Sequence, residues 1–375
     1  MVAHRAIAGR AIRHVVFGML TMWLAVGMTP RAVSASEAAE CADSPKLRFI
    51  CGAERPEDVA RIPGTRWLVF SGFANGAGLK LVDTASYSMR LWYSGAPEQI
   101  QHDRKGFPRC SSPPSVETFN AQGISLRTVE PGMHRLYVAN HGGREAIEVF
   151  SIDARADEPE LSWIGCAPLP DGIAANSVAT YSDGTILASV LTHPGTSITD
   201  FVLGRTTGGV YEWRPGSGAF KLLEGTQLPG NNGIETSPDD KEFYVVAFGW
   251  RSVVVFSRAD PSKPLRRAVA PGFMPDNIHW QEGRLLLAGM QYDEPACGGL
   301  RKIVDGKADG MLCRRGYSVA QLDPASMEFK LIAYDGPDSV YNGVSAAVLV
   351  GEDLWLASYQ SDRVAVRGLG YSISR

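Results

Sequence analysis

Four short segments of the chain each place an amide or carboxylate side chain just after a turn and just before an apolar stretch. They lie roughly 45 to 120 residues apart, and a turn and a second apolar stretch follow most of them. A ring of similar sheet modules would bring such segments to one common axis. The four segments are Pro56-Glu57-Asp58-Val59, Ala175-Asn176-Ser177-Val178, Asn231-Asn232-Gly233-Ile234 and Pro275-Asp276-Asn277-Ile278.

Apolar stretches separated by turn residues recur in groups of about four strands, which is typical of the blades of a β-propeller. We therefore predict an all-β fold: a six-bladed β-propeller of four-stranded antiparallel blades around a central tunnel. The last group shows only three clear strands, and Leu47–Gly52 could supply the fourth from the other end of the chain. A pair of β-sandwiches is the alternative, but it would not explain polar segments at matching points of the repeat. The six groups cover residues 67–93, 124–166, 177–223, 233–268, 277–334 and 345–367.

A propeller would gather the polar side chains of these segments into a cluster in which every potential ligand atom is oxygen. Two of the side chains are anionic and three are neutral amides, a combination that suits a calcium ion. Five side chains would leave one to three of the six to eight calcium coordination positions open. The candidate ligands are Glu57, Asn176, Asn232, Asp276 and Asn277.

The N-terminus has the pattern of a secretory signal peptide. Three arginines precede an apolar run from Val15 to Met28, and Val33-Ser34-Ala35 gives the small-x-small cleavage pattern. The run is short for a membrane span, although an uncleaved anchor remains the alternative. We predict a signal peptide over 1–35, a single propeller domain over 36–375, and an exported protein that is periplasmic or secreted, with no transmembrane span after cleavage. Cleavage would remove four arginines and no acidic residue, which changes the formal net charge from −3 to −7.

The six cysteines take their meaning from export, because an even number in an oxidising compartment favours disulfides. Six cysteines allow about 15 pairings, and no Cys-x-x-Cys pair suggests a zinc site. Cys297 and Cys313 bracket a loop and form the most plausible local pair. The negative net charge offers no basic surface, so we expect no nucleic-acid partner.

The quoted segments, read in order, resemble the paraoxonase/arylesterase group of calcium-dependent six-bladed propellers and, more distantly, the gluconolactonase and strictosidine-synthase-like propellers. Three further stretches carry the same resemblance, which extends from about Glu54 to the C-terminus. Each stretch is short and weakly specific alone, but their order and spacing agree. These stretches are Phe119-Asn120-Ala121-Gln122-Gly123-Ile124-Ser125, Leu136-Tyr137-Val138-Ala139-Asn140-His141 and Tyr341-Asn342-Gly343.

The resemblance implies that the five candidate ligands bind a calcium ion at the mouth of the central tunnel. It also implies a second, structural calcium deeper in the tunnel, with Asp58 and the backbone carbonyl of Ile124 among its ligands. Ser177 stands where the family places a carboxylate beside the ligand asparagine, and this loss of charge should weaken the deeper site.

The resemblance also implies two catalytic positions, Gln122 and His141. The paraoxonases place a histidine before the Gly-Ile-Ser stretch, and it is proposed to activate water. Gln122 stands there in this chain and cannot act as a general base, although it can orient water or substrate. His141 matches the second histidine of that pair; a packed histidine in the tunnel wall is the alternative reading.

Two functions remain open. The first is an exported calcium-dependent hydrolase of small-molecule lactones or esters, in which the metal polarises the carbonyl. The second is a non-catalytic, calcium-stabilised propeller that binds a small ligand or a protein partner. The Gln122 replacement favours the second, and the complete set of calcium ligands favours the first. Serine-hydrolase, zincin and nucleotide-binding motifs are absent, and the sequence leaves the substrate and the oligomeric state open.

Overall fold

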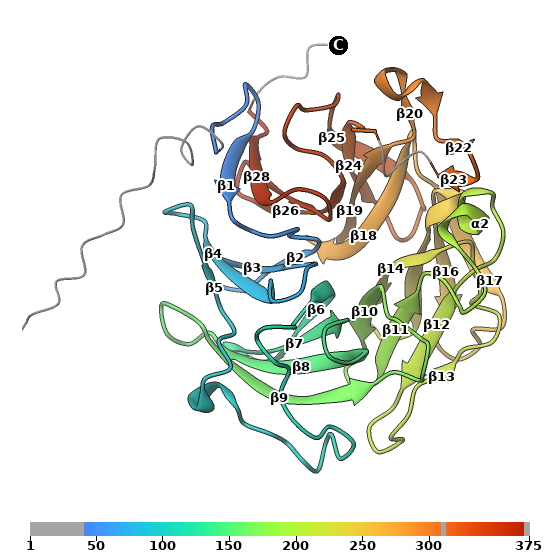
Figure 1. The fold of residues 1–375 in the computed structure, drawn as a ribbon. Helices are drawn as coiled ribbons and strands as arrows, with labels where there is room; N and C mark the ends of the chain where they lie inside the picture. The colour runs from blue at the N-terminus through green and yellow to red at the C-terminus, as the bar shows by residue number, and fades with distance from the viewer. Residues whose placement is uncertain (1–40, 309–312, 371–375) are drawn as a thin grey trace, which may run out of the picture. The chain divides into compact units, whose positions relative to one another are not determined.

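The computed structural model describes residues 41–308 and 313–370, and nearly all regular structure in them is β-strand. Six antiparallel sheets of four strands each are arranged as the blades of a β-propeller (Figure 1). This confirms the predicted fold class. The predicted signal peptide lies outside the described residues and stays a prediction.

We number the blades from the first complete sheet in the chain. In blades 1 to 5 the four strands pair in the order in which they follow along the chain, whereas blade 6 takes its fourth strand from the other end. Blade 1 holds β2 (Val59–Arg61), β3 (Trp67–Ser71), β4 (Leu79–Asp83) and β5 (Ser88–Leu91); blade 2 holds β6 (Ala121–Glu130), β7 (Met133–Asn140), β8 (Ala146–Asp153) and β9 (Glu160–Pro168); blade 3 holds β10 (Ser177–Thr180), β11 (Ile186–Val190), β12 (Gly209–Trp213) and β13 (Lys221–Leu222). Blade 4 holds β14 (Asn231–Thr236), β15 (Glu242–Ala247), β16 (Ser252–Ser257) and β17 (Pro264–Val269); blade 5 holds β18 (Phe273–Gln281), β19 (Arg284–Gln291), β24 (Tyr317–Leu322) and β25 (Phe329–Asp335); blade 6 holds β26 (Val344–Val350), β27 (Asp353–Ser358), β28 (Arg363–Gly368) and β1 (Arg48–Cys51).

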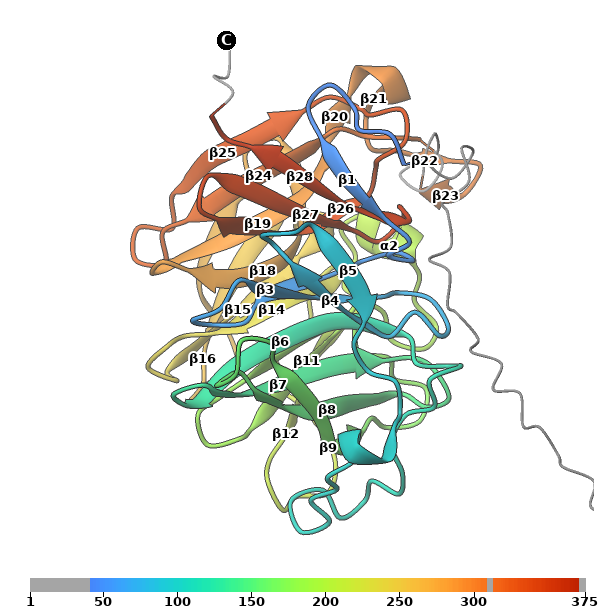
Figure 2. The same cartoon turned by 90° about the vertical axis from the view of Figure 1, so that its left-hand side faces the viewer.

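Blade 6 is closed by a strand from the other end of the chain. β1 pairs antiparallel with β28, with Arg48 opposite Val366 and Cys51 opposite Arg363. Both views place the blue β1 beside the red β28 (Figures 1 and 2). The sequence showed three strands here and predicted this closing strand within Leu47–Gly52, which the pairing confirms.

The blades are held together by apolar side chains that alternate along each strand. In β15, Phe243 and Val245 pack in the cluster shared with blade 3, whereas Tyr244 and Val246 pack in the cluster shared with blade 5. Because successive strand residues point to opposite faces, one strand can serve two interfaces. Burial of each such side chain contributes about 1.5–3 kcal/mol, so the ring of blades needs no separate central core.

Three disulfides join the six cysteines. Cys297–Cys313, at a sequence separation of 16, confirms the predicted local pair, and the others are Cys41–Cys51 and Cys110–Cys166. Cys110–Cys166 fastens the long connection after β5 to the outer strand of blade 2, along which this connection also runs in Figure 2. Cys41–Cys51 fastens the segment before β1 to the closing strand.

Short elements outside the blades lie in their connections. The hairpins β20 (Asp293–Glu294) with β21 (Gly299–Leu300) and β22 (Ile303–Val304) with β23 (Lys307–Ala308) are inserted between β19 and β24 of blade 5. The helical elements are η1 (Pro97–Gln99), α2 (Ile198–Val202), η2 (Phe248–Trp250) and η3 (Pro295–Cys297). Within residues 41–308 and 313–370, none of the helices has the length and apolarity that crossing a membrane requires.

Candidate metal and catalytic site

The inner strands of the blades all begin at the same end of the central tunnel. At this end, the backbone N–H of Gly123 donates to the carbonyl oxygen of Asn176 at 3.1 Å, which joins blade 2 to blade 3. At the other end, the Thr236 hydroxyl donates to the carbonyl oxygen of Thr180 at 2.8 Å, which joins blade 4 to blade 3. We call the first end the ligand end, because the candidate metal ligands lie just before the inner strands or no further along them than the middle residue.

β-bulges shape the beginnings of four inner strands. In blade 4, Asn231 pairs with Ala247 and Ile234 with Val245, so one extra residue is inserted on the inner strand. The same irregularity occurs between Pro275 and Ile278 in blade 5, and in blades 2 and 6. A bulge bends its strand and changes the direction of a side chain. Asn232, Asp276 and Asn277 lie in the bulges of blades 4 and 5.

Close packing between blades 4 and 5 requires a glycine beside the candidate ligands. A Cβ atom on Gly233 would lie 2.5 Å from the carbonyl oxygen of Asp276 and 2.9 Å from the Cα of Asn277. Both are backbone atoms, which cannot rotate away. The Asn-Gly-Ile order of the segment therefore has a packing cause: the glycine lets the neighbouring bulge approach the asparagine.

The candidate calcium ligands contain buried oxygens that have no hydrogen-bond partner. Among the described residues, five amide or carboxylate oxygens are in this condition, and four of them belong to the predicted ligand set. Leaving such an atom buried and unpaired costs about 1–3 kcal/mol each. Coordination of a hard cation would satisfy all four, so the residues fit a calcium ion. The four atoms are Glu57 Oε2, Asn176 Oδ1, Asn232 Oδ1 and Asn277 Oδ1.

A direct contact connects two of the five candidate ligands. The Asn277 amide nitrogen donates to Glu57 Oε1 at 3.0 Å, and the Ser345 hydroxyl donates to the Glu57 carbonyl oxygen. The side chain of Asn232 also lowers the pKa of the neighbouring Asp276 carboxyl group. The nitrogen of Asn277 is therefore bound inside the cluster, and the amide oxygens of Asn277 and Asn232 have no partner. Asn176 comes just before β10, with its own oxygen buried in the same way.

Burial and mutual repulsion keep the two carboxyl groups of the cluster from ionising easily. Burial, followed by the charge of Asp58, raises the pKa of Asp276 to about 7. Burial, followed by the charges of Asp58 and Asp276, raises the pKa of Glu57 well above its usual value. A divalent cation between them would reverse both effects, because an adjacent positive charge favours the ionised form.

Asp58, the predicted ligand of a deeper calcium, has a different environment. Its Oδ2 accepts the backbone N–H of Ile124 at 2.8 Å, and its Oδ1 accepts Nε2 of His279 at 2.7 Å. Burial alone would lower the pKa of His279, but the carboxylates of Asp58 and Glu235 raise it to about 10. A histidine cation therefore already compensates the charge of Asp58. The buried Ser177, which follows Asn176, adds no charge, and the second calcium site stays a prediction.

The two predicted catalytic residues are in contact. His141 Nε2 lies 2.6 Å from Gln122 Oε1, and Nδ1 lies 2.8 Å from Glu145 Oε2. Glu145 can therefore hold the Nδ1 proton, and the Gln122 amide can present its oxygen or its nitrogen to Nε2. The sequence left His141 without a partner in proton transfer, whereas the structure provides a carboxylate that orients the ring. Phe73 packs edge-on against the same ring.

Sequence reasoning missed three residues of this region. Glu145 follows His141 by four residues. On a helix this spacing would place the two side chains on one face, but these residues lie in a turn, so no pattern in the sequence predicts the contact. Tyr359 directly follows β27, and burial, followed by the charge of Asp276, raises the pKa of its hydroxyl. The charge of Arg301 acts in the opposite direction on Asp276 and lowers its pKa. Each contact joins segments that are remote in the chain or irregular.

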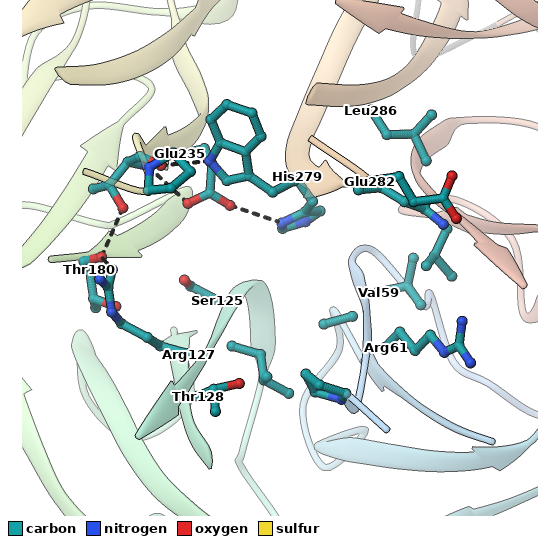
Figure 3. A pocket seen from close by; sticks show the side chains of 18 of the residues that line it. Val59, Arg61, Ser125, Arg127, Thr128, Thr180, Glu235, His279, Glu282 and Leu286 are labelled. Carbon is teal, nitrogen blue, oxygen red and sulfur yellow. Dashed lines mark hydrogen bonds and ion pairs between the residues drawn. The ribbon is translucent and has the colours of Figure 1, made fainter. Parts of the chain in front are cut away.

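Two cavities lie at opposite ends of the tunnel. At the ligand end, about 420 Å³ is lined by Arg55, Phe73, Cys313, Arg314, Asn342, Tyr359 and Gln360. The larger cavity, about 770 Å³, lies where the inner strands end, and Figure 3 shows Glu235 and His279 pointing toward each other in it. The larger volume lies away from the unpartnered oxygens and His141. The ligand-end cavity is the one that lies at the same end of the tunnel as these groups.

The fold and the site define a six-bladed β-propeller with an all-oxygen cluster at one tunnel mouth. No family model matches the chain, and no curated protein matches it. A solved luciferin-regenerating enzyme is 15% identical, covers 87% of this chain and 96% of its own, and has a TM-score of 0.50. A protein provisionally assigned as a gluconolactonase is 12% identical, covers 88% and 95%, and has a TM-score of 0.47. At these identities the likeness concerns the fold, for which the expected resemblance is confirmed.

Proposed function

We propose that the protein is an exported calcium-dependent hydrolase of lactones or esters. The observation that carries this proposal is the set of four buried oxygens without hydrogen-bond partners at the ligand end. A second observation supports hydrolysis: His141 is oriented by Glu145 close to the start of the same inner strands. The three disulfides are consistent with an oxidising compartment.

Glu57, Asn176, Asn232, Asp276 and Asn277 would hold the ion. A bound calcium would polarise the substrate carbonyl and stabilise the negative charge that develops on its oxygen. The buried carboxylates of Glu57 and Asp276 would balance the charge of the ion, and Asn277 would keep Glu57 in place through its amide nitrogen. This division explains why Asn277 has its amide nitrogen bound and its amide oxygen without a partner.

His141 would move the proton. Water attacks the carbonyl carbon, a C–O bond forms, and His141 Nε2 accepts the proton that the water loses. The same proton then passes to the leaving alkoxide as the acyl C–O bond breaks, which gives a hydroxy acid from a lactone or an acid and an alcohol from an ester. Because Gln122 contacts Nε2 at 2.6 Å, its amide must give way to the water or hold it.

The Gln122 replacement favours a second candidate function, a calcium-stabilised propeller that binds a ligand without hydrolysing it. A panel of lactones and aryl esters, assayed with calcium and with chelator, separates the two. Turnover that requires calcium is expected for the hydrolase. No turnover of any member with calcium saturated would overturn the hydrolase and leave the binding function.

A further inference from the structure

Among the described residues, those that line the ligand-end cavity carry positive charge and no negative charge. Arg55 and Arg314 line it, together with two aromatic rings and two amides, and no Asp or Glu is among its lining residues. The cavity at the other end of the tunnel is mixed, because Glu235 and Glu282 line it along with Arg61 and Arg127. The formal net charge of the chain is −3, so two arginines without an acidic residue among the described lining residues do not follow from average composition.

Neither arginine is neutralised within the part of the chain that the structure describes. Arg55 and Arg314 are exposed, and no ion pair joins either side chain to a carboxylate there. Other arginines of this protein are paired: Arg66 binds Asp157, and Arg266 binds Glu242. Two guanidinium groups therefore face the cavity with their donors available to an incoming group.

The backbone fixes Arg55 at the mouth of the site. Its N–H donates to the carbonyl oxygen of Ser361 at 3.0 Å, and its own carbonyl oxygen accepts the N–H of Phe73 at 2.8 Å. Its φ of 60° and the φ of 56° at Glu54 are left-handed values that non-glycine residues adopt rarely. Such strain persists where surrounding contacts enforce it, often at ligand sites.

The walls of the cavity are shared with the proposed chemistry. Phe73 packs against the ring of His141, with centroids 5.8 Å apart. Tyr359 directly follows β27, and its hydroxyl donates to the sulfur of Met290 at 3.4 Å. Arg55 precedes Glu57 by only two residues. A substrate in this cavity would thus lie between the metal ligands, His141 and the two arginines.

We infer that the substrate of this site carries a carboxylate in addition to its lactone or ester group, and that Arg55 and Arg314 bind that carboxylate. The inference rests on the proposed function and specifies its substrate class. A guanidinium presents paired N–H donors that match a carboxylate, and charge-assisted hydrogen bonds are the stronger kind. The arginines would also attract an anion toward a protein whose overall charge repels it. Phe73 and Tyr359 would contact the carbon skeleton.

A matched pair of esters tests this inference. Phenyl acetate and 4-carboxyphenyl acetate have the same acyl group and differ by one carboxylate. We expect the ratio of kcat/KM for the carboxylate ester over the neutral ester to be high in the wild type. It should fall about 10–100-fold in Arg55→Gln and in Arg314→Gln, which is the loss of one charge-assisted hydrogen bond. Arg61→Gln, which removes an equivalent charge at the other tunnel end, should leave the ratio unchanged.

Binding provides a readout that does not need turnover. Glutarate, titrated calorimetrically into calcium-saturated protein, should bind the wild type and Arg61→Gln, and should lose affinity in both cavity variants while their melting temperatures match the control. If neutral esters are hydrolysed but replacing Arg55 or Arg314 changes neither the kcat/KM ratio nor glutarate binding, the substrate inference is wrong and the hydrolase function stands. If no ester is hydrolysed but arginine-dependent glutarate binding persists, the hydrolase fails and the carboxylate site stands.

Discussion

The amide of Asn277 reaches across 220 positions of sequence to the carboxylate of Glu57, with its nitrogen 3.0 Å from Oε1. The contact uses one oxygen of Glu57 and leaves Oε2 buried without a partner, together with the amide oxygen of Asn277. This hydrogen bond thus joins two blades, and the two oxygens that it leaves without a partner are both acceptors. That arrangement is unfavourable by itself and favourable around a cation.

The substitution Asp276→Asn should change stability in opposite directions with and without calcium. In chelator, the variant should melt slightly higher than the wild type, because it removes a carboxyl group that burial disfavours as an anion. With calcium at about 100 times its dissociation constant, the wild type should gain about 2.7 kcal/mol, and the variant should gain much less. Thermal melts of both proteins measure this. Asp260→Asn, at an exposed turn, is the control, and equal wild-type melting temperatures with calcium and with chelator would refute the metal site.

Metal-free protein should lose stability as the pH rises from about 4 to 7. The pKa of Asp276 is raised from 3.8 to about 7 in the folded state, so the folded chain keeps a proton that the unfolded chain releases in this window. The free energy of unfolding then falls with increasing pH. Glu57, whose pKa is also raised, acts in the same direction. Chemical denaturation in chelator at several pH values measures the slope.

Calcium should remove that slope, because ligation requires the ionised carboxylates. Calcium affinity should accordingly increase with pH across the same window, as protons and metal compete for the same oxygens. Asp276→Asn should flatten the slope in chelator. A metal-free stability that instead rises with pH would show that the two carboxyl groups are not buried together.

Replacement of His141 by Gln should lower kcat by about 10²–10⁴-fold, the usual contribution of a general base, and leave calcium affinity unchanged. Glu145→Gln should cost less, since the ring keeps its position but loses the carboxylate that orients it. Gln122→Ala should reduce kcat only modestly. Steady-state kinetics with calcium titration for each variant provides the comparison. If His141→Gln keeps full kcat, the proton acceptor lies elsewhere.

Gly233→Ala should weaken calcium binding without touching a ligand. The new Cβ would lie 2.5 Å from the Asp276 carbonyl oxygen and push the bulge of blade 5 away from Asn232. Gly336→Ala is the matched control, because nothing lies within 4 Å of its Cβ position and its φ is not positive. We expect lower calcium affinity and a lower melting temperature for the first variant alone. Unchanged affinity in Gly233→Ala would mean that the two bulges can separate freely.

Most of the fold could be predicted from the sequence because propeller blades repeat a local pattern. Turns such as Ser182-Asp183-Gly184 separate apolar stretches, and the missing fourth strand of blade 6 pointed to its replacement near Leu47. The innermost strand of blade 1, Val59–Arg61, has three residues and gives little periodicity of its own. The hairpins inserted in blade 5 have two-residue strands, too short for any pattern to mark.

The candidate ligands could be predicted because each follows a turn in the same part of its repeat. Their surroundings could not, because the contacts come from other blades or from irregular backbone. The His279 side chain forms an ion pair with Asp58, 221 positions away in the chain, and neither segment has a pattern that predicts this contact. Arg55 lines the cavity with its backbone in the left-handed conformation, which non-glycine residues rarely adopt and which the sequence therefore does not predict. Two of the three disulfides remained among the open pairings for the same reason.

The pairing of β1 with β28 makes the ring depend on both extremes of the described chain. During synthesis, residues 48–51 are among the earliest of the domain to appear, and their partners at 363–366 among the last. Until then one strand edge stays unpaired and open to other chains. The ring can therefore close only when the chain has been made to its last strand. A chain that stops before Arg363 can form five blades but leaves β1 without its partner. We expect proteases and chaperones to act preferentially on such a chain.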